Sequence, residues 1–503
     1  MTLSWLLGLP LLGALLIFLS PREKSGRFLA FGVSLLTFLV SLKFYFNFDP
    51  FDGGFQFQEK LDFGAGLGFH DSMGLDGVSL WFILLTAFLT PLCVAGDSGN
   101  RRPRGKVFYA CLLILEAGAF GAFSAGDLFW FFLCWECMLV VFFYLFRFFG
   151  SARRAPATFQ FVFFMMGASL LLLLGFLQLV GHVHSFDYSV IFNQVLPDDL
   201  QFWCFLALAG AFLIQIPVPP FHSWMADLYA EAPIGGAFFL AAIFSSLGIY
   251  GFIRYEVPLF PSAALIFDPW FLGLGLAVVV YGNLRAAIQG DARRLAASFR
   301  TAQVGWILLG LFCFSMTGFE GALLETMALA VSSGTFFIVL GMIERRGGKA
   351  LERLAAGTAR APRLALALLA ALLGLAAVPG LGDFSGIFLI LVSLENISPL
   401  WGLAAAAAFV FSIWPLTRLF GIIFKNGAAI QASSRHKIED LTFQEALLLL
   451  PFFLASMGIG LYPGVFLQPM EKTVQLNVLQ RLNALPAMMD FAAQQHRLQD
   501  EKR

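Results

Sequence analysis

The sequence predicts an all-α protein that crosses a membrane about fourteen times. Of its 503 residues, 59% are hydrophobic and only 13% are charged, far below the quarter or so typical of soluble domains. Apolar runs of about 20 residues, the length that spans a bilayer, recur from one end of the chain to the other. The net charge is zero, so nothing indicates a nucleic-acid partner, and the lipid bilayer is the expected environment.

The predicted spans are apolar runs separated by short polar or basic loops. They start near Leu3, Phe28, Gly77, Val107, Leu128, Gln160, Trp203, Ile234, Ala263, Thr301, Gly321, Leu364, Leu400 and Phe443. The first run has no basic segment before it and no small-residue cleavage site, so we expect it to be retained as a helix.

Two spans contain a break at membrane depth. The seventh is interrupted at Pro217, followed by Pro219 and Pro220, and the twelfth is interrupted between Pro379 and Gly382. Proline lacks an N–H and restricts the residue before it, so a continuous helix cannot pass through such clusters. Irregular backbone survives at this depth only where it is buried in protein or lines a wet cavity, and broken helices are typical of ion pathways in transporters.

The two breaks lie five spans apart. An odd offset gives the two segments opposite orientations, which predicts two inverted five-helix repeats with broken helices 7 and 12. The expected division is three N-terminal helices in residues 1–106, the first repeat in 107–256, the second repeat in 257–426, and helix 14 with the C-terminal tail in 427–503. Apolar positions at helical spacing in the tail predict a surface or partner-binding helix.

Glu136 is the least ambiguous candidate for ion chemistry, because it lies in mid-span with apolar residues on both sides. A lone carboxylate there needs a partner or water, and Glu116 is a second carboxylate in the preceding span. His222 and Asp227 follow the first break, and a helical turn would stack Asp227 and Glu231 on one face. The structural alternatives are a protonated acid held between helices for Glu136 and a capped half-helix end for the others.

Other polar features favour structural roles. The basic loop from Gly290 to Arg300 is typical of an anchor on the inner side of the membrane. Asp127 and Asp383 each precede or begin a helix, where a carboxylate commonly caps the N-terminus. The glycine-rich stretches lie between or inside apolar spans, so they give almost no support for phosphate or nucleotide binding.

Seven stretches, in order along the chain, carry a family signature. They are LDGVSLWFILLTAFLTPLC (75–93), WECML (135–139), PFHSW with EAP (220–233), YGFIRY with LFP (250–261), GD..RL (290–295), PGLGDFSG (379–386) and LYPGVFL (461–467). Together they resemble the chain-M family of antiporter-like subunits of proton-translocating NADH:quinone oxidoreductase, respiratory complex I. The same motifs occur more weakly in related subunits of cation/proton antiporters.

This resemblance implies a fourteen-helix antiporter-like fold with two inverted repeats, in a bacterial plasma membrane. It implies partners among the other membrane-arm subunits of a multi-subunit complex that transfers electrons to quinone. It also implies that this subunit binds no cofactor, because NADH, FMN, the iron–sulfur clusters and quinone would be bound elsewhere in the complex. The family moves protons through a chain of buried Glu, Lys and His residues.

The chain departs from the family at most positions of that relay. Glu136 matches the family's carboxylate in span five. Where the family has a lysine at the first break, a lysine in span eight, histidines in spans ten and eleven, and an acidic or basic residue after the second break, this chain has Gln215, Ser246, Gln303, Leu329 and Ile387. Glutamine and serine can hold water but cannot store a proton, and isoleucine can do neither.

Three interpretations therefore stay open. The chain could take part in proton pumping through another route of residues, or hold its neighbours together without conducting. A subunit of a cation/proton antiporter is the third, although it would call for more buried carboxylates than Glu116 and Glu136.

The charge distribution yields a testable topology. Loops after odd-numbered spans carry 24 of the 32 lysine and arginine residues, so these loops should face the cytoplasm and both termini should lie outside. Reporter fusions or cysteine labelling in the loop from Arg345 to Arg363 should report a cytoplasmic location. An external location would contradict the predicted orientation.

Overall fold

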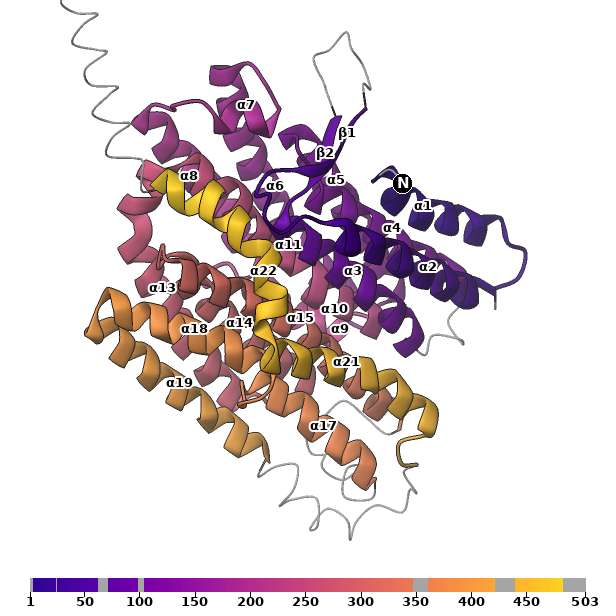
Figure 1. Cartoon of the computed structure of the whole chain (residues 1–503). Helices are drawn as coiled ribbons and strands as arrows, with labels where there is room; N and C mark the ends of the chain where they lie inside the picture. Colours follow the sequence, from indigo (N-terminus) through magenta and orange to yellow (C-terminus); the bar gives the residue numbers. More distant parts are fainter. Residues whose placement is uncertain are drawn as a thin grey trace, which may run out of the picture.

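The computed structural model consists almost wholly of helices packed side by side (Figure 1). It describes residues 3–23, 25–61, 71–97, 104–346, 361–420 and 439–482. Within these ranges, ten helical stretches are long and apolar enough to cross a membrane, which confirms an all-α multi-pass membrane protein. Each predicted span corresponds to a helix or a broken helix in the described residues, while the number of fourteen crossings stays a prediction.

The N-terminal part contains three helices and an unpredicted hairpin. The helices are α1 (Ser4–Leu19), α2 (Ser25–Asn47) and α3 (Gly77–Gly96). Between α2 and α3, strands β1 (Gln56–Leu61) and β2 (Asp71–Leu75) pair in antiparallel fashion. The polar composition of this loop gave no strand signal, because the hairpin is short and its sides do not alternate clearly.

The first four spans of the first predicted repeat form a group of helices that ends in a broken one. Their elements are α4 (Gly105–Phe123), α5 (Leu128–Phe149), α6 (Arg154–Val183), a short α7 (Tyr188–Phe192), α8 (Asp198–Gln215) and α9 (Ser223–Glu231). The gap between α8 and α9 confirms the predicted break near Pro217, because these prolines cannot continue the helix.

The eighth span, which follows, is irregular although it contains no break. Its elements are α10 (Ile234–Phe239), the π-helical η1 (Leu240–Phe244), α11 (Ser245–Gly251), the π-helical η2 (Phe252–Glu256) and α12 (Val257–Leu259). Every residue in the most apolar part of this span is buried inside the chain. Two π-helical turns in one span are uncommon and often accompany a functional site.

The second predicted repeat has the same outline. Its elements are α13 (Pro261–Ile288), α14 (Ala292–Leu311), α15 (Met316–Glu344), α17 (Pro362–Leu375), α18 (Gly382–Ile397) and α19 (Pro399–Phe420). The gap between α17 and α18 confirms the second break. Gly380 lies within it at a φ of 93°, a conformation that residues with a side chain rarely adopt.

The two breaks share one hydrogen-bond pattern. After α8, the N–H of Val218 donates to the carbonyl of Leu213 at 3.0 Å, and after α17 the N–H of Val378 donates to the carbonyl of Leu373 at 3.3 Å. Each bond joins an N–H to the carbonyl of the residue five positions earlier and closes the end of the helix before the chain changes direction. This correspondence supports an internal repeat, and its inverted orientation stays a prediction.

The second helix of each predicted repeat, α5 or α14, begins with an aspartate cap. Asp127 accepts hydrogen bonds from the N–H groups of Phe129 and Trp130 at the start of α5. Asp291 accepts from the N–H groups of Arg293 and Arg294 at the start of α14. The predicted capping role of Asp127 is therefore confirmed, and its counterpart in the second repeat caps in the same way.

The C-terminal elements pack back onto the N-terminal helices. They are α21 (Phe443–Leu461), α22 (Pro463–Val474) and the π-helical η4 (Gln475–Leu479). Figure 1 shows α22, in yellow, running from α21 toward α8, and it also contacts α3. The predicted tail helix is thus confirmed up to residue 482, whereas residues 483–503 and most of the loop from Arg345 to Arg363 lie outside the described residues.

One carboxylate outside the spans ties α17 to α21. Asp440, just before α21, accepts hydrogen bonds from the N–H groups of Arg363 and Leu364 at the start of α17. Slight burial raises the pKa of Asp440, but these N–H groups and the Arg363 charge outweigh burial and hold the pKa below its ordinary value. An anion at a helix N-terminus also complements the helix dipole.

A buried ion pair joins two segments that are far apart in the sequence, and the rings of two further segments pack against it. Arg254 in η2 contacts Asp76, the N-cap of α3, at 2.5 Å (Nη1–Oδ2), and both side chains are buried. The Arg254 guanidinium also lies over the rings of Phe55, 4.1 Å from the centroid, and Tyr188, at 4.5 Å. Asp76 therefore serves two purposes, because it caps α3 and neutralises the cation in span eight.

Replacing Arg254 by methionine should destabilise the chain by about 3–5 kcal/mol, because it leaves the buried Asp76 charge without its cation. The thermal midpoint of the detergent-solubilised protein, followed by size-exclusion chromatography, measures this loss. Adding Asp76→Asn should restore part of the midpoint, because asparagine still caps α3 without a charge. An Arg254→Met variant as stable as the parent would contradict a structural role for the pair.

Candidate functional site

Gln215 ends α8 directly before the first break and is completely buried. Its Nε2 donates to the carbonyl of Phe244, the last residue of η1, at 3.1 Å. A side chain at Gly248 would come within 2.8 Å of Gln215 Oε1, so glycine leaves the room that the amide occupies. Gln215 thus holds the broken helix against the irregular eighth span, and an amide does not titrate.

Ser246 does not extend this contact. It is 1% exposed in α11, and its hydroxyl donates to the carbonyl of Ala242 in the preceding turn at 2.8 Å. Gln215 and Ser246 are therefore each hydrogen-bonded to the backbone, and in the described part of the chain no side-chain hydrogen bond joins the two. At the two positions where the family has lysines, this chain therefore has a hydrogen bond between two helices, made by Gln215, and a hydrogen bond within one helix, made by Ser246.

Glu136 lies in the middle of α5, as expected, at the edge of the packed helices. Its neighbour Trp135 faces inward, with ring centroids 6.0 Å from Phe244 and 6.3 Å from Phe212. Glu136 itself is partly exposed on the next face of α5, beside the exposed Cys137. Its Oε1 is nevertheless buried without a hydrogen-bond partner in the described residues, so the carboxyl group is partly enclosed and not fully buried in mid-span.

Two other carboxyl groups are fully enclosed. Glu116 in α4 is completely buried and faces the Thr90 hydroxyl of α3. Glu256, which closes η2, is completely buried and faces the backbone of Ala209 in α8. The sequence reasoning identified Glu116 and missed Glu256, because Glu256 stands near the end of span eight, where a charged residue is ordinary.

The residues after the first break separate into two environments. His222 is partly buried, and its Nε2 lies 2.7 Å from the Tyr281 hydroxyl and 2.7 Å from Arg285 Nη1. Asp227 is about half exposed and forms a surface ion pair with Arg294 at 2.8 Å. A pair of this kind contributes little to stability and offers a poor site for a buried proton.

The basic loop is more than an anchor. Arg293 is 3% exposed, and its guanidinium contacts Glu344 at 2.6 Å (Nε–Oε1) and donates to the carbonyls of Tyr229 and Ala232 at the end of α9. A cation at a helix C-terminus satisfies carbonyls that lack helical partners. Only Arg294 of this group has the exposed position that an anchor implies.

Two buried carboxyl groups that the sequence reasoning did not combine face each other beside the second break. Glu325 in α15 and Asp383 in the first turn of α18 are each completely buried and interact electrostatically. Asp383 Oδ1 accepts a hydrogen bond from the Ser332 hydroxyl at 2.9 Å. Its other oxygen and both Glu325 oxygens are buried without a hydrogen-bond partner in the described part of the chain.

Close helix packing brings this pair together. A side chain at Gly386 of α18 would lie 2.6 Å from the backbone nitrogen of Glu325, and one at Gly321 of α15 would lie 2.8 Å from the Gly386 carbonyl. Small residues at both positions let the two backbones approach. Two carboxylates this close in a dry interior cannot both be ionised at low cost, so the pair is suited to holding a proton.

The sequence contained a signal for this pair. Glu325 lies within the apolar run of span eleven, so the rule that selected Glu136 also selects it. Asp383 was interpreted as the cap of the half-helix, but the N-cap is Leu381, which makes no side-chain capping bond. The Asp383 side chain is directed to Ser332 of α15 instead.

A buried cation lies nearby on α14. Arg300 is 2% exposed, and its Nη1 donates to the Ser333 hydroxyl at 3.3 Å. Ser332 and Ser333 are consecutive residues of α15, so one hydroxyl contacts Asp383 and the next contacts Arg300. Gln303, one turn further along α14, donates to the carbonyl of Leu375 at the second break.

Comparisons with known proteins agree with this architecture. Residues 125–412 match the family described as NADH:quinone oxidoreductase/Mrp antiporter, TM. NADH-ubiquinone oxidoreductase chain 4 of Marchantia polymorpha is 30% identical over 94% of this chain and 96% of its own length. NADH-quinone oxidoreductase subunit M of Rickettsia conorii is 29% identical over 93% of this chain and 96% of its own length.

A solved structure extends the agreement to three dimensions. A chain of respiratory complex I from Thermus thermophilus superposes with a TM-score of 0.85 at 26% identity. The superposition covers 95% of this chain and 100% of that chain, so the antiporter-like fold is shared from end to end. The family model alone matches more than half of the chain. This chain therefore belongs to the NADH:quinone oxidoreductase/Mrp antiporter transmembrane family.

Proposed function

We propose that this chain is a membrane-arm subunit of a proton-translocating NADH:quinone oxidoreductase of the complex I type. The observation that carries the proposal is the end-to-end likeness to a chain of a respiratory complex I, together with relatives named as chain 4 and subunit M of this enzyme. In the proposed assembly, neighbouring membrane-arm subunits cover part of its surface. NADH, FMN, iron–sulfur clusters and quinone belong to other subunits, and a bacterial plasma membrane is the proposed location.

We propose further that the subunit does not move protons along the central axis of the family. Gln215 and Ser246 stand at two of the relay positions, and their side chains are bonded to backbone carbonyls. Ile387, 1% exposed in α18, stands at the position after the second break. None of these side chains can bind and release a proton at physiological pH.

The Glu325–Asp383 pair is the proposed proton-exchanging group. Asp383 lies one turn before Ile387 in α18, after the second break. A carboxyl group is therefore present close to the position where the family has an acidic or basic residue and this chain has isoleucine. The Ser332 hydroxyl donates to Asp383, and that of the next residue, Ser333, accepts from Arg300. Rearrangement of the broken helix would change access to such a pair, which is the usual role of broken helices in transporters.

Changing Glu136 to Gln should leave proton pumping by the assembled complex nearly unchanged, because Gln215 stands where the family has the lysine and provides no cation to keep Glu136 ionised. A route that needs Glu136 should instead lose at least about tenfold in rate, equal to about 1.4 kcal/mol in barrier. The measurement is NADH-driven proton uptake in vesicles at matched assembly. A large loss with assembly intact would show that conduction runs through Glu136.

Changing Glu325 to Gln should reduce proton uptake by about tenfold or more, while NADH oxidation in the uncoupled membrane stays close to the parent value. The matched control is Glu320→Gln, in the same helix but only partly buried. Normal pumping in Glu325→Gln would contradict the proposed role of the pair. Normal pumping in both Glu136→Gln and Glu325→Gln, beside a strong effect of deleting the subunit, would favour a non-conducting structural subunit.

The cation/proton antiporter is the second candidate function, because the family description includes Mrp antiporters. It differs in its assembly. A complex I subunit should co-purify with hydrophilic redox subunits and with NADH oxidation, and the genes for those subunits should lie nearby. An assembly that exchanges Na⁺ for protons without NADH oxidation would favour the antiporter.

A further inference from the structure

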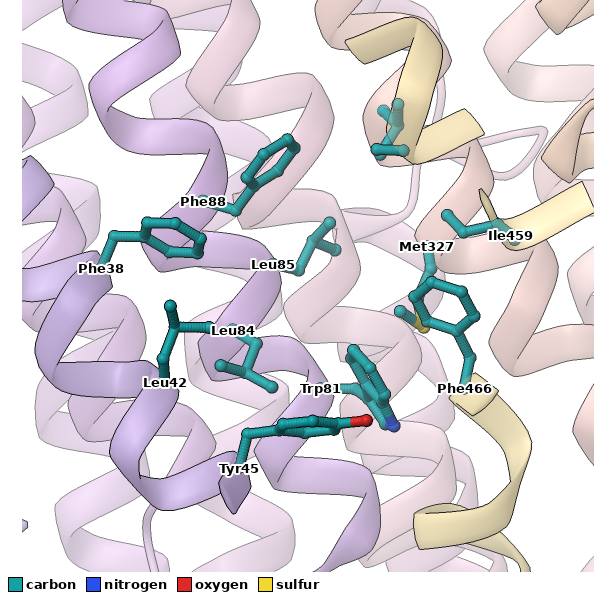
Figure 2. Close-up of a pocket in the computed structure, with 12 residues that line it drawn as sticks. Phe38, Leu42, Tyr45, Trp81, Leu84, Leu85, Phe88, Met327, Ile459 and Phe466 are labelled. Carbon is teal, nitrogen blue, oxygen red and sulfur yellow. The ribbon is translucent and has the colours of Figure 1, made fainter. Parts of the chain in front are cut away.

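A cavity of about 240 Å³ lies between α2, α3, α15, α21 and α22 (Figure 2). Aromatic and aliphatic side chains form its wall, and the only polar side-chain tips in the lining belong to Tyr45 and Trp81. The volume is several times the 30 Å³ or so that one water occupies, and water needs polar partners that this wall lacks. The cavity therefore suits hydrocarbon.

The cavity is open on one side and closed on the other. Its floor is buried, with Leu85 at 7%, Met327 at 3% and Val331 at 1% exposed. Phe38 and Phe88, on the opposite side, are partly exposed. The opening therefore faces the environment of the chain, and the floor faces α15.

The surface around the opening is apolar. Leu36 and Leu39 of α2 are 48% and 54% exposed, and Leu450 and Leu454 of α21 are 48% and 59% exposed. Both helices are long and apolar enough to span the membrane. An occupant of the cavity therefore enters from the hydrocarbon of the bilayer, where acyl chains are the abundant molecules.

Two polar groups, the Trp81 indole nitrogen and the Tyr45 hydroxyl, mark one end of the cavity. Trp81 is 8% exposed, and its Nε1 is buried without a hydrogen-bond partner in the described residues. Figure 2 shows the Tyr45 hydroxyl beside this nitrogen, and the two rings lie 5.5 Å apart between centroids. Indole N–H groups only donate, so the site calls for an acceptor at this end.

The depth of these two residues fits the ester region of a lipid. Tyr45 stands two residues before the end of α2, and Trp81 stands in the second turn of α3. Tryptophan and tyrosine commonly mark the level where the hydrocarbon meets the headgroups. From Trp81 the cavity extends along α2 and α3 toward Phe38 and Phe88, in the direction of the bilayer centre.

We propose that the cavity holds one acyl chain of a membrane phospholipid, whose ester carbonyl accepts a hydrogen bond from Trp81 Nε1. The chain fills space between the N-terminal helices and α15, α21 and α22, which otherwise meet across a void. The bound lipid is thus a structural ligand that joins the N-terminal helices to the second repeat. This inference does not depend on how the subunit handles protons.

The test is the number of phospholipids retained by the purified, detergent-washed complex, counted by mass spectrometry of its extracted lipids. Leu85→Trp places bulk in the cavity and should reduce retention by one phospholipid per complex. Trp81→Phe keeps the ring but removes the donor, and should release that lipid several-fold faster during washing. Leu170→Trp, on the exposed face of α6 and away from the cavity, is the matched control and should retain it.

Ala455→Leu, at the partly exposed rim, is the milder variant if Leu85→Trp does not assemble. Parental retention in either cavity-filling variant would overturn the proposal. A density map of the complex in dibrominated phospholipid gives a second readout, with bromine signal expected in the cavity. Density there for a quinone tail or for an apolar side chain of a neighbouring subunit would also overturn it.

Discussion

The interior of a bilayer supplies no hydrogen bonds, so each polar group in this chain must find its partner within the protein. The two helix breaks show how this is done. At each break a backbone N–H reaches back five residues to close the helix end, and a glutamine amide near each break binds a carbonyl that the irregular backbone exposes. The same requirement explains why Arg254 lies against Asp76 and why Arg293 lies against the carbonyls that end α9.

The sequence alone was sufficient for the fold class, for both breaks and for the Asp127 cap, whereas the cap expected at Asp383 was wrong. These features follow from local rules, because proline stops a helix wherever it occurs and aspartate caps a helix from the adjacent position. The family signature then supplied the overall architecture. The π-helical turns in span eight and the hairpin between α2 and α3 were not predictable, since both depend on tertiary packing that no local pattern records.

The candidate site was predictable only in part, and for a related reason. Hydropathy places Glu136 in mid-span but does not show which side of α5 faces the other helices. In the structure Trp135 faces inward, and Glu136, on the next face, is only partly buried. Glu325 and Asp383 lie 58 positions apart, and only the glycine contacts between α15 and α18 bring them together. Alignment to a family motif directs attention to the positions where titratable residues are missing, and away from positions where new ones are present.

The resulting account is that the scaffold of the family is retained while the titratable groups are redistributed. The central positions carry Gln215, Ser246 and Ile387, which tie helices together or fill space. In the proposed account, the second repeat contributes the buried carboxyl groups of Glu325 in α15 and Asp383, one turn before Ile387 in α18. Proton chemistry in this subunit would then depend on motion of α18 against α15 and not on a chain of lysines.

A density map of the purified complex at a resolution that shows waters tests this account most directly. The account predicts ordered waters that reach the Glu325–Asp383 pair from one side of the membrane, and a dry contact between Gln215 and the carbonyl of Phe244. A continuous file of water from Gln215 past Ser246 to Glu136, with the Glu325–Asp383 pair sealed in apolar surroundings, would contradict it.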